Sequence, residues 1–217
     1  MSGYMALIKK NFIIIKNYYA ILGLAAFVIP FVASGSASAY YGGILPLLMQ
    51  ATFTLYFAYN QLTFVESKYN SCTFLCITPY ARKTQVTAMY MTVLCEYCGI
   101  LLIYFILTLL PVGNIPSFTF SRVVIVTCII VVMYSIFIPV LYLLGYDKAK
   151  YAPAVATFVI PYAAVFFSKI PFLQTKNISS YLHLMKWYRM PVMCVMVLVF
   201  LGISIKMAVK WYNEKEL

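Results

Sequence analysis

Long unbroken blocks of apolar residues restrict the fold of this chain more than any other feature. The apolar residues do not alternate with polar ones, as they would in the strands of a membrane barrel. A helix, in contrast, satisfies its own backbone hydrogen bonds in lipid. The sequence therefore predicts an all-α, polytopic membrane protein with about six transmembrane helices. The six blocks approach the roughly 20 residues needed to cross the hydrocarbon and lie at about 17–34, 44–64, 86–110, 123–145, 152–168 and 190–209.

Composition agrees with lipid as the solvent. Of 217 residues, 64% are hydrophobic and 10% are charged, whereas soluble domains are about 45–50% apolar and about 25% charged. A water-soluble fold of this size could not bury so much apolar side chain. No repeat or extramembrane domain is evident, so we expect residues 1–217 to form a single transmembrane domain.

The basic residues predict the orientation, because cytoplasmic loops carry an excess of Lys and Arg. Eleven of the sixteen basic residues lie before span one, between spans two and three, between spans four and five, and at the end of span six or after it. The alternate segments carry the other five. Both termini are therefore expected in the cytoplasm. The net charge of +11 then reflects topology and attraction to anionic lipid, and no nucleic-acid binding is expected.

Residues 1–16 are expected to form an amphipathic helix in the cytoplasmic interface. A cleaved secretory signal is the alternative, because Ala37-Ser38-Ala39 offers a small-residue cleavage site. The segment before the apolar stretch is long and rich in Tyr and Ile, unlike the short basic segment of a secretory signal, and this favours an uncleaved first span. The expected apolar face consists of Tyr4, Met5, Ile8, Phe12 and Ile15.

The residues needed for enzyme chemistry are scarce. The chain has five acids and one histidine, with no H-E-x-x-H metalloprotease motif and no G-x-x-x-x-G-K-[ST] phosphate-binding loop. Cys95 and Cys98 have C-x-x-C spacing but lie inside span three, where we interpret them as small apolar residues. We expect no catalytic residue, cofactor site or metal site in this chain.

The segment 65–85, which joins spans two and three on the cytoplasmic side, is the most specific part of the sequence. Val65, Tyr69, Cys72 and Cys76 follow a 4-3-4 spacing, which places them on one face of a helix. Such a helix could lie on the membrane surface and contact a cytoplasmic partner. The alternative is a solvated loop that carries positive-inside charges.

The residues of this segment resemble a known family. Glu66-Ser-Lys68-Tyr69, Leu75, Thr78-Pro79-Tyr80-Ala-Arg82-Lys83, Val86 and Tyr90 follow in this order. They look like the first cytoplasmic loop of small ABC exporter permeases of the type-2 class, in which this loop holds the coupling helix. A departure is Met89, where many relatives carry Lys. The resemblance implies that five residues contact a separate nucleotide-binding ATPase subunit: Glu66, Lys68, Tyr69, Arg82 and Lys83.

The resemblance also implies a function. The chain would be the permease subunit of an exporter, paired as a homodimer or with a related permease in a bacterial plasma membrane. ATP and Mg would bind to the partner ATPase. An amphipathic or apolar cargo suits a lining rich in Phe, Tyr and Met. Because small bacterial relatives often handle antimicrobial or toxic peptides, peptide export or self-immunity is the preferred function. The alternatives are a non-transporting accessory or sensor subunit and an ATP-independent channel or carrier.

Glu96 is the costliest residue for the bilayer. It lies about ten residues into span three, which is roughly 15 Å deep. An ionised acid at that depth costs at least ~2.5 kcal/mol. Either Glu96 is protonated and bonded to a neighbouring helix, with a Tyr, Gln50 or Asn60 as candidate partners, or it lines the transport path.

The segment 169–189, expected outside between spans five and six, mixes aromatic and basic residues, which is typical of the membrane interface. The resemblance implies short helices here that dip into the outer leaflet and cap the pathway.

Overall fold

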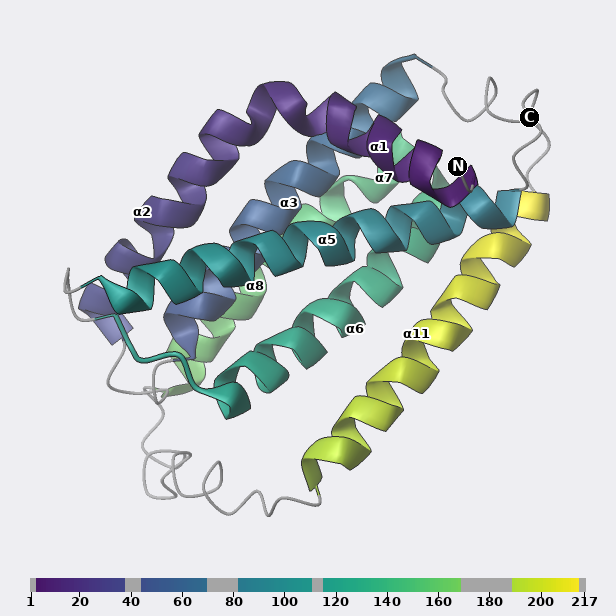
Figure 1. Ribbon diagram of the computed structural model, residues 1–217. Helices are drawn as coiled ribbons and strands as arrows, with labels where there is room; N and C mark the ends of the chain where they lie inside the picture. The colour runs from purple at the N-terminus through teal and green to yellow at the C-terminus, as the bar shows by residue number, and fades with distance from the viewer. Residues whose placement is uncertain (1–2, 38–43, 70–81, 111–114, 169–188, 215–217) are drawn as a thin grey trace.

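The computed structural model describes residues 3–37, 44–69, 82–110, 115–168 and 189–214 (Figure 1). Every regular element within these ranges is a helix, which confirms the prediction of an all-α fold. The elements, in chain order, are α1 (Gly3–Ile15), the short 3-10 helix η1 (Lys16–Tyr18), α2 (Tyr19–Ala37), α3 (Leu45–Lys68), α5 (Arg82–Leu109), α6 (Phe120–Leu144), α7 (Tyr146–Ala149), α8 (Tyr151–Ser168) and α11 (Arg189–Glu214).

Each of the six predicted spans corresponds to one long helix: α2, α3, α5, α6, α8 and α11, with boundaries shifted by a few residues. The chain is therefore a polytopic α-helical membrane protein. Its count of six spans stays a prediction, because within the described residues length and composition alone single out four stretches. These are Gly3–Ser34, Arg82–Leu109, Phe120–Leu144 and Met193–Glu214.

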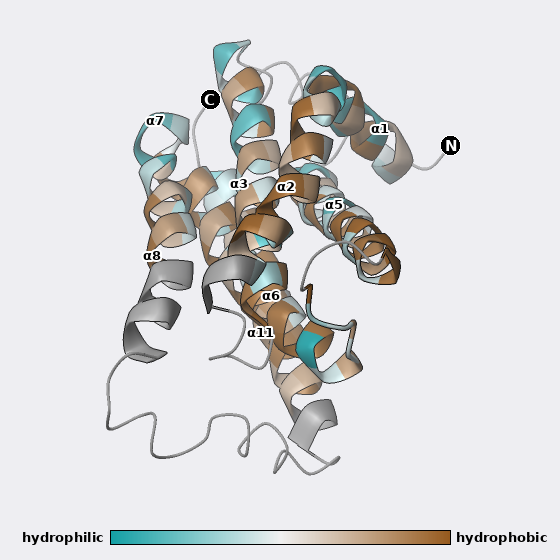
Figure 2. Cartoon of the chain, turned by 90° about the vertical axis from the view of Figure 1, so that its left-hand side faces the viewer, coloured by the Kyte–Doolittle hydropathy of each residue, from teal (hydrophilic) through white to brown (hydrophobic). Residues whose placement is uncertain are grey.

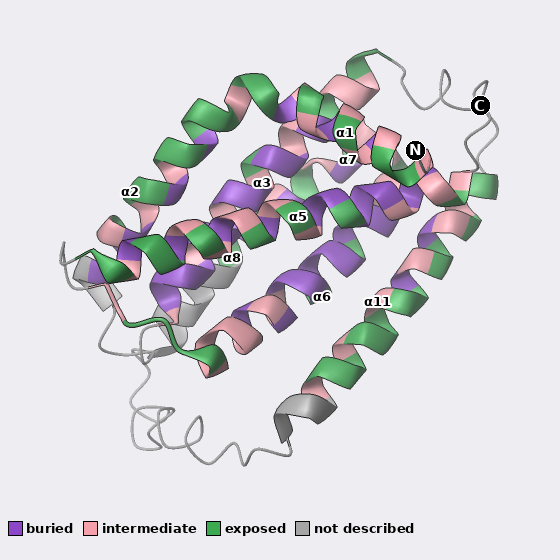
Figure 3. Ribbon diagram, in the orientation of Figure 1, coloured by how far each residue is buried: buried purple, intermediate pink, exposed green. Residues whose placement is uncertain are grey.

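Helix α3 lies inside the bundle, and this position explains its polar composition. It packs against α2, α5 and α8, and also against α1 and α6. Figure 3 shows buried residues along much of its length. Gln50, Thr52 and Thr63 are among its buried side chains. Neighbouring helices shield such polar groups from lipid and offer them partners, so α3 does not need the apolar composition of a lipid-facing span.

Helices α2 and α11 present apolar side chains on their outer faces. Leu24 of α2 is 66% exposed and Leu198 of α11 is 67% exposed. Figures 2 and 3 show these outer helices as largely apolar and exposed. Such faces are stable in contact with lipid or another membrane subunit, and not in water.

Helix α1 packs against α5 and α3. Its buried residues are Leu7, Asn11 and Ile15, which recur every four residues and so form one stripe. Met5, which belongs to the apolar face expected from the sequence, is 60% exposed. The packed stripe therefore shares only Ile15 with that face, and the interfacial location of residues 1–16 stays a prediction.

The two segments singled out in the sequence lie largely outside the described residues. Helix α3 extends to Lys68 and α5 begins at Arg82, so both ends of the 65–85 segment are helical. Cys72 and Cys76 of the predicted stripe fall outside the described part of the chain, as do 70–81 as a whole. The outer segment 169–189 also lies outside it, except for Arg189, where α11 begins.

Candidate coupling end and intramembrane polar contacts

The predicted ATPase contact residues lie at one end of the bundle. Glu66, Lys68 and Tyr69 are at the end of α3, and Arg82 and Lys83 open α5. The two helix ends border residues 70–81. Helix α1 and the end of α11 lie at the same end of the bundle (Figure 1), and the charge distribution predicts that this end faces the cytoplasm.

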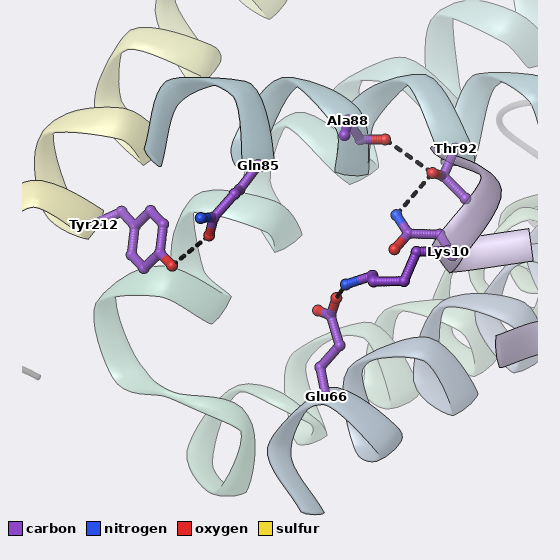
Figure 4. Close-up of polar contacts among 7 residues, drawn as sticks. Lys10, Glu66, Gln85, Ala88, Thr92 and Tyr212 are labelled. Carbon is purple, nitrogen blue, oxygen red and sulfur yellow. Dashed lines mark hydrogen bonds and ion pairs between the residues drawn. The ribbon is translucent and has the colours of Figure 1, made fainter. Parts of the chain in front are cut away.

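Glu66 is directed into the bundle. Its Oε1 atom lies 2.6 Å from Nζ of Lys10 in α1 (Figure 4). The Glu66 side chain is 16% exposed and that of Lys10 is 32% exposed, so water screens this pair less than a surface pair. The ion pair therefore joins the end of α3 to α1, and the Glu66 carboxylate is engaged inside the chain.

Arg82 is hydrogen-bonded to the end of α11. Its Nη1 atom donates to the carbonyl oxygens of Tyr212 and Asn213, at 2.9 and 3.0 Å. These carbonyls belong to the last turn of α11, which lacks intrahelical donors. A cation at a helix C-terminus is also favoured by the helix dipole. The Arg82 guanidinium lies 5.4 Å from the centre of the Tyr212 ring as well, so Arg82 fixes the start of α5 to the end of α11.

A buried tyrosine strengthens this junction. The hydroxyl of Tyr212, a residue that is 1% exposed, donates to Oε1 of Gln85 at 2.6 Å (Figure 4). The Tyr212 ring also packs against Tyr142 of α6, with ring centres 4.9 Å apart. Helices α5, α6 and α11 therefore meet at one aromatic residue.

The other three predicted contact residues face outward. Lys68, Tyr69 and Lys83 are all exposed, and Tyr69 is 61% exposed. Lys68 Nζ lies 5.6 Å from the centre of the Tyr69 ring. The five residues predicted to act together thus divide into two internal ties, Glu66 and Arg82, and three exposed side chains.

A small cavity of about 20 Å³ lies beside the Lys10–Glu66 pair and is also lined by Asn11 and Gln85. The Asn11 amide nitrogen donates to Oγ1 of Thr92 at 2.9 Å. Thr92 in turn donates to the Ala88 carbonyl oxygen (Figure 4). The buried Oδ1 atom of Asn11 has no hydrogen-bond partner among the described residues, so the cavity offers it room for a bridging water. Helix α1 is therefore held to α3 and α5 by polar contacts.

Glu96 contacts a tyrosine, one of the partner types expected from the sequence. The hydroxyl of Tyr19, at the start of α2, donates to Oε1 of Glu96 at 3.0 Å. Gln50 and Asn60, the other expected partners, make different contacts: Gln50 donates to Ala26, and Asn60 accepts from Tyr146. The contact joins α5 to the start of α2, and Tyr19 is exposed and Glu96 partly exposed.

Ser204 of α11 connects this helix to α6 and α5 through hydrogen bonds. Its hydroxyl donates to the carbonyl oxygen of Ser135 in α6 and lies 2.5 Å from the hydroxyl of Tyr90 in α5. Because Ser204 uses its proton on the carbonyl, Tyr90 donates to Ser204. Pro139 follows Ser135 by four residues and has no N–H, so the Ser135 carbonyl lacks its usual helical donor. Ser204 therefore replaces the hydrogen bond that Pro139 removes.

Helix α2 also contains a proline, and a side chain of another helix supplies the hydrogen bond that this proline removes. Pro30 leaves the Ala26 carbonyl oxygen without its helical donor. Nε2 of Gln50 in α3, which is fully buried, donates to that oxygen at 2.8 Å. Sequence reasoning did not identify Gln50 and Ser204 as the residues that complete proline-interrupted helices. The available signal was a proline inside a predicted span together with a polar residue at the middle of another.

Comparison with known proteins identifies the family. No curated protein and no solved structure matches the chain. The family of ABC-2 transporter proteins, however, matches residues 6–213, which is nearly the whole chain. The chain belongs to the ABC-2 family of transporter membrane proteins.

Proposed function

We propose that this chain is the permease subunit of an ABC exporter, driven by ATP and Mg²⁺ that bind to a separate ATPase subunit. Family membership supports a transport permease that is not itself the ATPase. The absence of a phosphate-binding loop from the sequence agrees with this division of labour. Export of an amphipathic or apolar cargo, with a peptide as the preferred class, is part of the proposal.

The arrangement of residues at the coupling end is the observation that carries this proposal. Lys68, Tyr69 and Lys83 are exposed on the two helix ends that border 70–81. An exposed tyrosine supplies apolar contact area at a protein interface, and lysines at its rim supply charge complementarity. We infer that these three side chains contact the ATPase, together with the segment between them.

Glu66 and Arg82 take a different part. A displacement of the 65–85 segment by the ATPase would reach α1 through Lys10–Glu66 and α11 through Arg82. These two contacts join the two ends of the segment directly to neighbouring helices. We therefore assign Glu66 and Arg82 to transmission and the three exposed residues to docking.

The transport cycle follows from this assignment. ATP binding would close the ATPase dimer, move both helix ends, and repack the spans about a cavity between two permease copies or this chain and a related one. The exposed apolar faces of α2 and α11 are compatible with a second permease as well as with lipid. A bacterial plasma membrane is the expected location.

Co-purification tests the proposal. An ATPase should co-purify in stoichiometric amount with the wild-type chain, and Lys68→Glu with Lys83→Glu should reduce its recovery. Lys148→Glu in α7, where the residue is also exposed, makes the same kind of charge change and should leave recovery unchanged. An accessory subunit, channel or carrier would show no stoichiometric ATPase. Equal losses in the double variant and in the Lys148→Glu variant would mean unspecific attraction to positive charge.

A further inference from the structure

Glu96 differs from the other acids that the structure describes. Glu66, Asp147 and Glu214 each lie within 4 Å of a lysine: Lys10, Lys150 and Lys210 respectively. Within the described ranges no basic group lies this close to Glu96, and its partner is the neutral Tyr19 hydroxyl. The acid placed deepest in the bilayer is thus the one for which the described chain supplies no cation.

The position of Glu96 makes this difference costly. It lies midway along α5, fourteen residues after Arg82, which corresponds to about 21 Å of helical rise. The residue is partly exposed, and its neighbour Cys95 is exposed. A carboxylate in this environment is stabilised by a cation or by water, and intramembrane acids commonly mark the path of a substrate.

The surroundings of Glu96 are apolar. A small cavity of about 10 Å³ between α1, α3 and α5, with room for about one water molecule, is lined by Glu96 together with Ile15, Leu55 and Val93. Tyr19 occupies one position on Oε1, whereas a carboxylate can accept about four hydrogen bonds. The site therefore combines unused acceptor capacity with an adjoining apolar surface.

We propose that Glu96 and Tyr19 form an acceptor site for the cationic group of an amphipathic cargo. This inference rests on the proposed transport function and adds the charge of the cargo. The ammonium or guanidinium of the cargo binds to the carboxylate, and its apolar chain lies against the apolar side chains around the site. Tyr19 is a positioning residue, because its hydrogen bond orients the carboxylate.

Binding of a cationic amphiphile with N–H donors tests the site. The protein, with any ATPase that co-purifies, is placed in phosphatidylcholine nanodiscs at pH 7, and saturable binding of dodecylammonium is measured after subtraction of empty discs. Dodecanol serves as the neutral probe of equal chain length. Glu96→Gln should weaken binding of the cation about tenfold or more, the loss of one charge-assisted contact, without changing dodecanol binding. Tyr19→Phe should have a smaller effect, and Glu214→Gln, which removes an exposed acid elsewhere, should have none.

Three results would overturn the inference: Glu96→Gln binds the cation as the wild type does; both probes weaken equally; or Glu96→Gln dissociates permease copies, which would mean that the acid pairs with a second chain. The melting temperature of the Glu96→Gln variant should stay within about 3 °C of that of the wild type. Failure of the proposed function is separate, because it would appear as a missing ATPase in the wild type while cation binding persists.

Discussion

Ser204 of α11 donates a hydrogen bond to the carbonyl oxygen of Ser135 in α6, the oxygen that Pro139 leaves without a helical donor. Backbone groups without partners are costly inside a bilayer because no water can replace them. The contact therefore lets α6 carry a proline at a buried position and makes its local geometry depend on α11. Tyr90 donates to the same serine, which extends this dependence to α5.

Ser204→Ala should destabilise the protein by about 1 kcal/mol, within the range measured for interhelical hydrogen bonds in membranes. The substitution leaves the Ser135 carbonyl and the Tyr90 hydroxyl without this partner. Unfolding in mixed micelles of detergent and sodium dodecyl sulfate measures the change in the free energy of unfolding.

Ser34→Ala is the matched control. Ser34 is also buried, but its hydroxyl donates to Phe31 within its own helix, so its loss breaks no contact between helices. If both alanine variants unfold at the same denaturant concentration, Ser204 has no special role at the Pro139 site.

Gln50 and Pro30 should be thermodynamically coupled. In the wild type, Gln50→Leu leaves the Ala26 carbonyl without its donor and should cost about 1 kcal/mol. Pro30→Ala restores a backbone N–H four residues after Ala26, so the helix can supply the donor itself. Gln50→Leu should therefore cost less in the Pro30→Ala background.

A double-mutant cycle measures this coupling from the unfolding free energies of the four proteins. The expected interaction energy is several tenths of a kcal/mol or more. Strict additivity would show that Gln50 stabilises the bundle through packing alone, and not through the carbonyl that Pro30 exposes.

The positions of the long helices could be predicted because one physical requirement sets them. A helix that crosses lipid needs a long apolar block, and the blocks found in the sequence coincide with α2, α3, α5, α6, α8 and α11. The helix ends were less predictable: α3 continues through Glu66 to Lys68, and α5 starts four residues before Val86. Charged residues end an apolar block without ending the helix, because their side chains can extend into the interface.

The contacts between helices could not be predicted, since they depend on which faces meet. The resemblance implied that Glu66 and Arg82 contact an ATPase, which stays a prediction, but no sequence pattern indicated that Lys10 lies beside Glu66 or that the last carbonyls of α11 lie beside Arg82. Likewise, a tyrosine was a candidate partner for Glu96, yet the identity of Tyr19 follows from how α2 packs against α5.

Arg82→Gln should loosen the junction of α5 and α11. It removes the charge that stabilises the end of α11, and the planar donor group that contacts Tyr212 and Asn213. We expect a loss of about 1–2 kcal/mol, and Arg82→Lys should recover part of it because lysine keeps the charge without the planar guanidinium. Thermal unfolding in detergent measures both.

Lys83→Gln controls for charge at the neighbouring, exposed position and should leave the melting temperature unchanged. ATPase recovery separates the two roles: Arg82→Gln should keep the partner bound while lowering transport, whereas loss of the partner from Arg82→Gln would place Arg82 in the docking surface instead.

The orientation of α6 tests the topology of the whole chain. Ser117 precedes this helix and Lys148 follows it, and both are exposed. The 25 residues of α6 rise about 37 Å, which exceeds the roughly 30 Å of hydrocarbon, so the two positions should lie on opposite sides of the membrane. Lys148 and Lys150 lie on the side predicted to be cytoplasmic.

In a protein without its native cysteines, an impermeant maleimide added to intact cells should label Ser117→Cys, whereas Lys148→Cys should react only after permeabilisation. Cysteines at Gly42 and Asn177, the other expected outer positions, should behave like Ser117→Cys. The opposite pattern would invert the orientation and move the coupling end to the outside, where no ATPase could reach it.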